Sequence, residues 1–363
     1  MFLLNEILLT LPFLLYAGLR LRWFLDRPRW KNTWTVIFVL LLGAYPLAES
    51  LAHGALGGAP WAVLMVGYYG LPYTLYFLLT VVLTDLLLLG MRASGILSRE
   101  WLQRRRIRLA RFWTMVGLPA LIVLGGIVNF THLRVSAYTI DVPRRQSKLD
   151  HLRIVFASDF HLGDLTAPGF MADFVAHVNA LNPDLVLIGG DVIEGDRRGE
   201  AVEAFTSQFR RLRATYGVFG VLGNHEGFGG ASRDAFFADG GITLLKDEVR
   251  QVDSAFCVAG RLDAGRGGSR PRRKSAADLL SGVPDDLPLI VVDHRPTDLD
   301  AISQTATDIQ FSGHTHAGQL FPVNFITTRQ YELMWGYMKK RNTNIFVSSG
   351  VQVWGPRVRT VGV

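Results

Sequence analysis

Long apolar stretches dominate the first third of the chain. They cover approximately the ranges Phe2–Leu19, Trp34–Leu51, Leu71–Leu89 and Trp113–Phe130. Each approaches the ~20 residues that a helix needs to cross the hydrocarbon core of a bilayer. The third stretch is the end of a longer apolar run, and we start its span near Leu71 because the following Pro72 favours the first turn of a helix. The pattern predicts a transmembrane bundle of about four α-helices over residues 1–130.

Basic residues cluster in two of the three segments that connect these stretches. The segments carry Arg20, Arg22, Arg27, Arg29 and Lys31, and Arg92, Arg99, Arg104, Arg105, Arg106, Arg108 and Arg111. Residues 53–60 carry no Lys or Arg. Basic loops stay in the cytoplasm. The pattern therefore predicts a multi-pass protein of the inner or cell membrane whose C-terminal domain is extracytoplasmic, and this orientation inverts if one stretch only lies on the surface.

One carboxylate, Asp85, lies among leucines of the third stretch. A charged group inside a bilayer is costly and must face another helix or a wet cavity. Asp85 is therefore either a substrate or proton site within the bundle, or the partner in an interhelical hydrogen bond. A transport or sensing function would depend on the first alternative.

From residue 131 onward, short apolar runs alternate with helical patterns. Polar residues directly follow five such runs, at 153–157, 184–188, 217–222, 287–292 and 308–312. Strands buried on both faces have continuous apolar runs, and ligands gather at the carboxyl ends of such strands. We therefore predict a layered α/β domain over residues 131–363. Val135–Val142 alternates like a further strand, and Cys257 lies in an apolar run that predicts a buried strand residue.

The polar residues at these strand ends are suited to metal binding. They are Asp159, His161, Asp191, Asn224, His225, His294, His314 and His316. Carboxylate, imidazole and amide ligands without thiolate suit Mn²⁺, Fe or Zn²⁺. The set is larger than one tetrahedral shell, which indicates two ions. A pair ~3.5–4 Å apart can bind phosphoryl oxygens and activate a hydroxide.

The order of these motifs resembles a known family. The motifs are Asp159-x-His161, Gly190-Asp191, Gly223-Asn224-His225-Glu226, His294 and Gly313-His314-Thr315-His316. Together they resemble the calcineurin-like metallophosphoesterase superfamily, and the ending of the chain is similar to its bacterial membrane-anchored branch. The resemblance implies a four-layer α-β-β-α sandwich and a metal-dependent phosphoric ester hydrolase.

The same resemblance implies a role for each residue. One ion would be held by Asp159, His161, Asp191 and His316, and the other by Asn224, His294 and His314 with Asp191 bridging. His225 would stabilise the transition state or protonate the leaving oxygen. Glu194 stands where many relatives carry an Asp that orients this histidine. Two divalent ions are implied, with Mn²⁺ preferred and Fe or Zn²⁺ as alternatives.

The distribution of charge narrows the choice of partner. Up to Asn129 there are 12 Lys and Arg against 5 Asp and Glu, and from Phe130 onward 26 against 26. A catalytic part without excess positive charge argues against a nucleic-acid partner. Some members of the wider superfamily cleave UDP-2,3-diacylglucosamine, so the resemblance favours a phosphoester or pyrophosphate bond on a lipid-linked substrate. The alternatives are a phosphodiesterase for a soluble substrate with the membrane part as a tether, or a transport or sensing protein regulated by the metal domain.

Two further segments each have two interpretations. Arg266–Lys274 is basic and either approaches anionic groups or forms a solvated insertion. Phe321–Met338 is rich in large apolar residues. It either forms an apolar wall for an acyl chain or the bilayer, or packs in the core.

Overall fold

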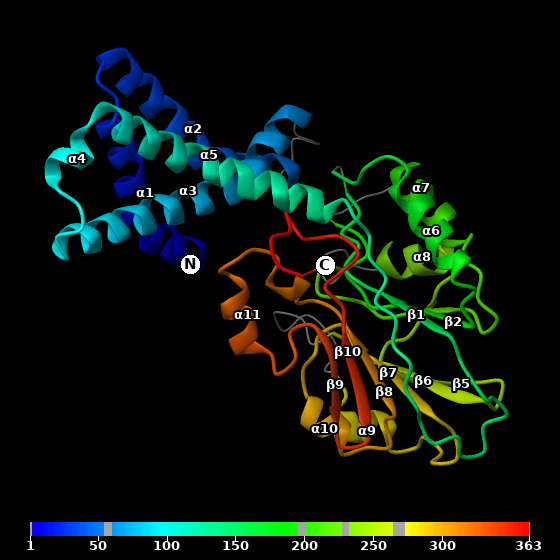
Figure 1. The fold of residues 1–363 in the computed structure, drawn as a ribbon. Helices are drawn as coiled ribbons and strands as arrows, with labels where there is room; N and C mark the ends of the chain where they lie inside the picture. The colour runs from blue at the N-terminus through cyan, green and yellow to red at the C-terminus, as the bar shows by residue number, and fades with distance from the viewer. Residues whose placement is uncertain are drawn as a thin grey trace. The chain divides into compact units, whose positions relative to one another are not determined.

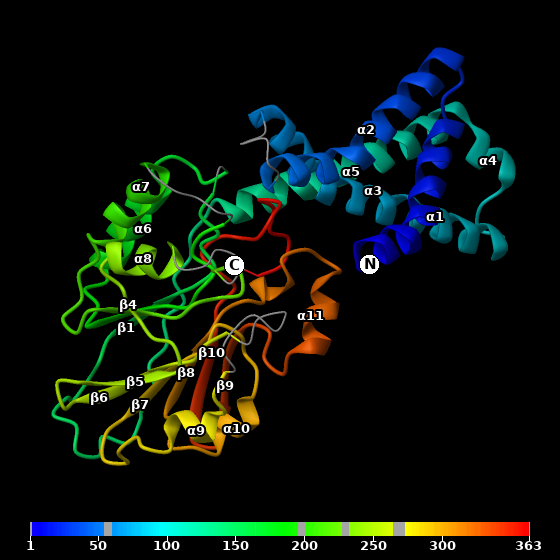
Figure 2. The same ribbon diagram turned by 180° about the vertical axis from the view of Figure 1, so that it is seen from behind.

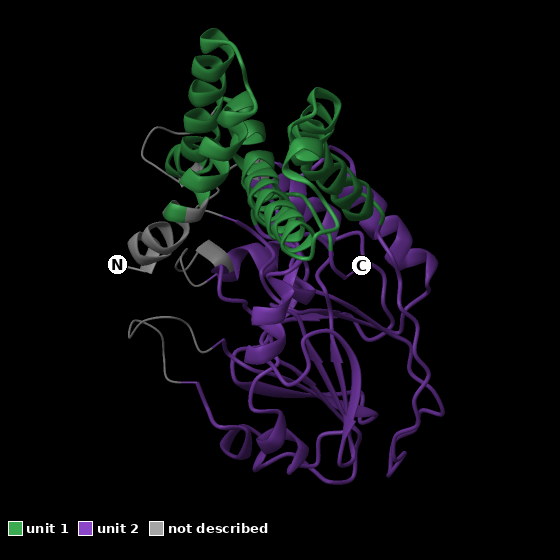
Figure 3. Cartoon of the chain, turned by 60° about the vertical axis from the view of Figure 1, so that its left-hand side comes forward, with its two compact units in different colours: residues 1–132, 355–360 green, residues 133–354, 361–363 purple. Residues whose placement is uncertain are grey.

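The computed structural model describes residues 2–53, 60–163, 165–194, 200–226, 232–263 and 273–362. The chain divides into two compact units, which Figure 3 shows in different colours. A helical unit comprises residues 1–132 together with 355–360. The second unit, which we call the catalytic unit because it carries the candidate ligands, comprises residues 133–354 together with 361–363.

The described residues of the helical unit form the helices α1 to α5 (Figure 1). They are α1 (Phe2–Trp23), α2 (Pro28–His53), α3 (Trp61–Ala93), α4 (Arg99–Gln103) and α5 (Arg105–Phe130). Among the described residues, α3 and α5 are the two helices long and apolar enough to cross a membrane. The other two expected spans are helical but stay predictions as membrane spans.

The third expected span begins earlier than the sequence indicated. Helix α3 starts at Trp61, so the prediction of a start near Leu71 was wrong. Pro72 lies inside the helix and is buried. A proline removes one backbone hydrogen bond, but helices with apolar, well-packed surroundings tolerate this loss.

Asp85 is the centre of a polar cluster in the helical unit. Its carboxylate accepts hydrogen bonds from Arg20 Nε at 2.5 Å, Arg20 Nη2 at 2.9 Å and Arg111 Nη2 at 3.2 Å. Tyr16 donates a further bond of 2.7 Å. The carboxylate thus joins α1, α3 and α5 through ion pairs. Of the two interpretations of Asp85, the structure shows the interhelical hydrogen bond. Two arginines counted as loop charges, Arg20 and Arg111, belong to this cluster.

The segment 355–360 is part of the helical unit although it follows the catalytic unit in the chain. The backbone N–H of Arg359 donates to Gly126 O at 3.0 Å, and Asn129 Nδ2 donates to Arg359 O at 3.0 Å. The hydroxyls of Tyr76 and Thr360 lie 2.5 Å apart. Residues near the end of the chain are therefore bonded to α3 and α5.

The catalytic unit contains two sheets. The first has the parallel order β1-β2-β3-β4, and the second has the mixed order β5-β6-β7-β8-β10-β9. The strands are β1 (Ile154–Ala157), β2 (Leu185–Ile188), β3 (Val218–Gly220), β4 (Thr243–Leu244), β5 (Glu248–Val252), β6 (Phe256–Gly260), β7 (Leu289–Val292), β8 (Ile309–Ser312), β9 (Gly336–Lys340) and β10 (Thr343–Val347). In the second sheet β6, β7, β8 and β10 are parallel, and β5 and β9 are antiparallel edge strands.

Helices cover the outer face of each sheet (Figures 1 and 2). These are α6 (Phe170–Ala180), α7 (Glu200–Phe209) and α8 (Ser232–Asp239) on the first sheet, and α9 (Ala276–Leu280) and α10 (Leu299–Ser303) on the second. Successive residues of β2 alternate between two cores because strand side chains alternate in direction. Val186 and Ile188 face the helices, whereas Leu185 and Leu187 face the other sheet. A third core lies between the second sheet and α9 and α10. The predicted four-layer α-β-β-α sandwich is confirmed.

The five predicted strands that precede polar residues are present as β1, β2, β3, β7 and β8. Cys257 is buried in β6 as predicted. The strand predicted at Val135–Val142 is wrong, because no strand forms there. Ile140 and Val142 instead pack against the inter-sheet core from outside. One-sided packing produces the same alternation as a strand without requiring a hydrogen-bonded partner.

Candidate metal centre

The predicted ligands and the predicted catalytic His225 all lie just beyond the carboxyl ends of strands. Asp159 and His161 follow β1, Asp191 follows β2, Asn224 and His225 follow β3, His294 follows β7, and His314 and His316 follow β8. The structure brings their side chains together into three overlapping groups: Asp159, His161 and His316; His161, Asp191 and His225; and Asp191, His294 and His314. Within each group the potential ligand atoms lie within 4.8 Å of one another.

The first group is built around two facing imidazoles. His161 Nε2 lies 3.1 Å from His316 Nε2, and His316 Nε2 lies 3.7 Å from Asp159 Oδ1. His161 Nε2 is also 3.9 Å from Asp191 Oδ2. All four residues are buried. Asp191 therefore connects this group to the next.

The second group is centred on His294. Its Nε2 lies 3.1 Å from Asp191 Oδ2, 3.1 Å from Asn224 Oδ1 and 3.2 Å from His314 Nδ1. The opposite ring nitrogen, Nδ1, lies 2.8 Å from Gly189 O. A carbonyl oxygen can only accept, so Nδ1 carries a proton, and Nε2 faces a carboxylate, an amide oxygen and another imidazole.

The charges of the two imidazoles differ, and together with Asp191 they suit a bound cation. Burial lowers the pKa of His294, but the charge of Asp191 and its hydrogen bond raise it to about 10. Burial and the charge of His294 lower the pKa of His314 to about 3, so its imidazole is neutral, the form that binds metals. The residues present therefore fit divalent ions with nitrogen and oxygen ligands and no thiolate.

Five of the candidate ligands have a positive φ angle, a backbone conformation that residues other than glycine rarely adopt. The φ angles are 57° for Asp159, 44° for His161, 51° for Asp191, 72° for His314 and 50° for His316. A non-glycine residue in this region is strained by about 1–3 kcal/mol and usually persists only where function or surrounding structure requires it. The sharp turns after β1, β2 and β8 thus direct successive polar side chains into one site.

Glycines beside the ligands allow the loops to approach each other. Gly190 has a φ of 86°, and a Cβ there would lie 2.5 Å from Gly223 N. A Cβ at Gly223 would overlap the carboxylate of Asp191. Both positions therefore need glycine for a physical reason, which explains the Gly-Asp and Gly-Asn sequences at these strand ends.

Glu194 connects two of the histidines. Its carboxylate bonds to His161 Nδ1 and lies 3.0 Å, through Oε2, from His225 Nδ1. Burial raises the pKa of Glu194, but the hydrogen bonds from the two imidazoles lower it to about 2. Burial lowers the pKa of His225, while Glu194 and Asp191 raise it to about 9. The structure therefore brings the two predicted catalytic residues together and adds His161 to the contact.

Glu226 has a structural role that the sequence analysis did not assign. It is 3% exposed, and its carboxylate accepts from the backbone N–H groups of Gly223 at 2.6 Å, Asp191 at 2.9 Å, Val192 at 2.5 Å and Ile193 at 3.3 Å. It therefore ties the β2 loop to the β3 loop. Its place in the motif next to His225 was visible, but three of its four partners lie more than 30 residues away.

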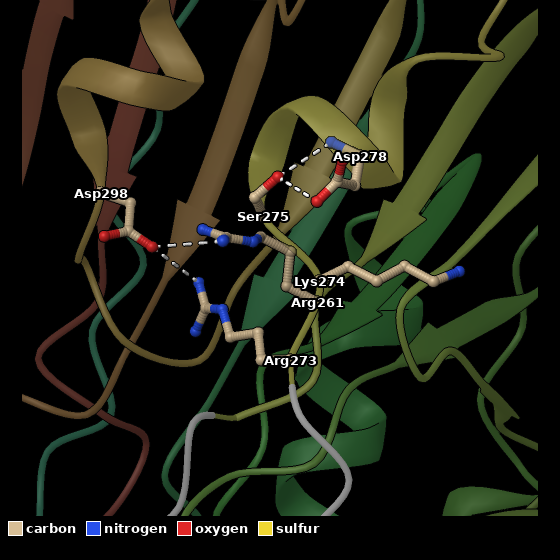
Figure 4. A pocket seen from close by; sticks show the side chains of 6 residues that line it. All are labelled: Arg261, Arg273, Lys274, Ser275, Asp278 and Asp298. Carbon is tan, nitrogen blue, oxygen red and sulfur yellow. Dashed lines mark hydrogen bonds and ion pairs between the residues drawn. The ribbon is translucent and has the colours of Figure 1, made fainter.

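A buried ion-pair cluster supports the His294 loop. Arg261 Nη1 lies 3.0 Å from Asp293 Oδ2, and the guanidinium of Arg273 bonds to the same carboxylate. Both arginines also contact Asp298, as Figure 4 shows. They line a pocket of about 550 Å³ together with Lys274, Ser275 and Asp278. Of the basic segment Arg266–Lys274, only Arg273 and Lys274 lie within the described residues, and Arg273 is largely buried rather than solvated.

Comparison with known proteins identifies the catalytic unit. The family model described as calcineurin-like phosphoesterase matches residues 152–318. A metallophosphoesterase of Aquifex aeolicus is 30% identical over 62% of this chain and 87% of its own length. The chain belongs to the calcineurin-like phosphoesterase family.

Other relatives of this phosphoesterase resemble it over less of their length. A metallophosphoesterase of Helicobacter pylori is 32% identical over 60% of this chain and 60% of its own. A transmembrane protein with metallophosphoesterase domain from Bos taurus is 30% identical over 61% of this chain and 53% of its own. The chain thus spans about 60% of the length of the Helicobacter pylori relative. The family uses divalent metals, which agrees with the clustered His and Asp side chains of this phosphoesterase.

Proposed function

We propose that this phosphoesterase is anchored in a membrane, binds two divalent metal ions, and hydrolyses a phosphoester or pyrophosphate bond of a lipid-linked substrate. The observation that carries the proposal is the set of acceptors around His294 Nε2, which lies 3.1 Å from Asp191 Oδ2 and 3.2 Å from His314 Nδ1. A divalent ion bound among these atoms would take the place of the proton that the raised pKa of His294 otherwise keeps on Nε2.

Each side chain has a distinct place in the proposed site. Asp159, His161 and His316 would hold one ion, and Asn224, His294 and His314 the other, with Asp191 shared. Mn²⁺ is our first choice, and Fe and Zn²⁺ suit the same ligands. When bound, such ions polarise phosphoryl oxygens and supply a hydroxide nucleophile near neutral pH.

His225 would act on the leaving group. Its Nδ1 bonds to Glu194, which directs Nε2 into the site, 4.0 Å from Asp191 Oδ2. Its side chain is 20% exposed, whereas those of His161 and His294 are at most 2% exposed. A partly exposed imidazole held by a carboxylate can donate a proton to a departing oxygen at the mouth of the site.

The membrane part supports the choice of a lipid-linked substrate. Helices α3 and α5 are long and apolar enough to span a bilayer, which would hold the catalytic unit where lipid phosphates are concentrated. We further propose several spans and an extracytoplasmic catalytic unit, because the basic residues other than Arg111 at and between the facing ends of α3 and α5 favour the cytoplasm for that loop. A nucleic-acid partner is not expected.

The test uses full-length protein purified in detergent with Mn²⁺. Asp191→Asn and His225→Ala should each lower kcat/KM for the hydrolysis reaction at least 100-fold. Asp191→Asn should also lower the metal content, measured by plasma mass spectrometry, from about two ions per chain. Asp173→Asn is the matched control because it makes the same change at an exposed residue of α6. Normal turnover in both site variants would disprove the proposal.

Product analysis then separates the substrate classes. Wild-type protein is incubated with lipid phosphates, lipid pyrophosphates and UDP-linked lipids, and products are identified by mass spectrometry against Asp191→Asn. A product formed only by the wild type fixes the bond that is cleaved. Turnover restricted to soluble phosphodiesters would instead favour a catalytic unit for which the membrane helices are only a tether.

A further inference from the structure

Exposed apolar side chains of the catalytic unit are concentrated next to one helix. Among its described residues, ten large apolar side chains are exposed, and six of these lie between residues 321 and 337. Four of the six form what we call the α11 face: Phe321, Val323, Phe325 and Ile326, which are 50%, 39%, 53% and 58% exposed. Helix α11 (Asn324–Gln330) has no buried residue. Clusters of exposed apolar side chains mark interaction sites or ligand-binding grooves.

The α11 face is distinct from the neighbouring core. Leu333 and Met338 pack against the small buried cluster that contains Ile345. The rings of Phe321 and Phe325, in contrast, contact each other with their centroids 5.6 Å apart. Core packing therefore accounts for Leu333 and Met338 but not for the α11 face.

The α11 face adjoins the metal centre. The short 3₁₀ helix η2 (His316–Gly318), which contains the ligand His316, leads directly to it. A Cβ at Gly318 would overlap Asn324, so the helix lies against the ligand loop. At its other end, the ring of Tyr331 lies 5.9 Å from that of His314, and Thr315 Oγ1 donates to Met334 O at 2.5 Å. Both ends of α11 are thus held to the loop that carries His314 and His316.

We infer that the α11 face binds the hydrocarbon chain of the substrate while the phosphoester occupies the metal centre. This inference rests on the proposed function. It assigns the selectivity of the enzyme for the hydrocarbon chain of its substrate to Phe321, Val323, Phe325 and Ile326. When the hydrocarbon chain lies along these side chains, its own apolar surface and that of the α11 face are both removed from water. The face should therefore make turnover depend on chain length.

The charge around the face favours a substrate chain over the bilayer as its occupant. Helices that lie in a membrane interface are rich in Lys and Arg on their polar side. Helix α11 carries one cation, Arg329, beside Thr327, Thr328 and Gln330. The direct link from the face to two candidate ligands also places it where part of a bound substrate must lie.

The test is a series of p-nitrophenyl alkyl phosphodiesters with methyl, butyl and octyl chains, used below their micelle concentrations with full-length protein and Mn²⁺. Each methylene that becomes fully buried increases affinity by about fourfold, and each methylene bound on a half-open face by about twofold. We expect kcat/KM to rise at least tenfold from methyl to octyl. In Phe325→Ser/Ile326→Ser this ratio should fall below about threefold. Val135→Ser is the matched control, because Val135 is 59% exposed elsewhere in the same unit, and it should keep the wild-type ratio in the same detergent.

The outcomes separate this inference from the proposed function. If wild-type protein cleaves neither the diesters nor any lipid phosphate, lipid pyrophosphate or UDP-linked lipid, the proposed function fails and the inference falls with it. If the diesters are cleaved but the ratio is flat, or persists in the double variant, the inference alone is wrong. Quenching of Phe325→Trp by brominated lipids in nanodiscs, with an unchanged ratio in the double variant, would assign the face to the bilayer and also overturn it.

Discussion

Glu226 offers a direct test of how the metal-site loops are held. Its Oε1 accepts from Val192 and Ile193, and its Oε2 accepts from Asp191 and Gly223. In Glu226→Gln one oxygen becomes an NH₂ group. Whichever way the amide turns, two backbone N–H groups then face a donor instead of an acceptor.

The magnitude follows from the number of bonds lost. A hydrogen bond to a charged group contributes about 1.5–3 kcal/mol, and a buried donor left without an acceptor costs a similar amount. Loss of two such bonds should therefore lower the free energy of unfolding of the catalytic unit by about 3–6 kcal/mol. For a domain of this size that corresponds to a decrease in Tm of about 6–24 °C.

The assay combines thermal unfolding of the full chain with hydrogen exchange resolved by peptide. Glu226→Gln should lower the Tm and should increase exchange at the amides of Asp191, Val192 and Gly223. Glu248→Gln is the control, because Glu248 pairs only with the exposed Arg250 and should change stability by less than about 0.5 kcal/mol. Equal Tm values for the two variants, with unchanged exchange at the loops, would refute the reasoning.

Three further substitutions test other parts of the molecule. Glu194→Gln removes the charge that orients His161 and His225 and should lower kcat/KM about 10–100-fold; initial rates within twofold of the wild type would contradict the proposed orientation. Asp85→Asn leaves Arg20 and Arg111 without their carboxylate and should make the helical unit more sensitive to limited trypsin digestion, while turnover of a soluble diester stays within about twofold; unchanged digestion would show that the ion pairs do not stabilise the bundle. Arg261→Met leaves the buried Asp293 with Arg273 alone and should lower the free energy of unfolding by about 3 kcal/mol, whereas Arg250→Met at an exposed position should change it little; a Tm shift no larger than that of the control would show that the cluster is dispensable.

The sequence predicted the strand ends well because two signals coincide there. Runs such as Leu185–Ile188 are apolar throughout, since both faces of the strand are buried, and a polar motif follows each run directly. The edge strands were harder to see. In β5 the polar Arg250 and Gln251 face solvent, so the apolar run is broken although the hydrogen-bonded ladder is intact.

Contacts between distant residues left no local pattern. Glu226 lies 35 residues from Asp191, and Arg261 lies 32 residues from Asp293, so neither partner could be inferred from spacing. The opposite error occurred at Val135–Val142, where alternation reflected packing on one side only. Pro72 led to an error for a third reason. We took it to mark the first turn of a helix, but a proline can also be accommodated inside a helix with apolar surroundings.

The chain passes from the helical unit to the catalytic unit near residue 132 and returns near residue 355. Residues 355–360 are then bonded to Gly126, Asn129 and Tyr76. In the membrane-anchored protein that we propose, a single cut after Phe130 would therefore leave the catalytic unit joined to the helices through residues 355–360. Its release would then require a second cut close to Trp354.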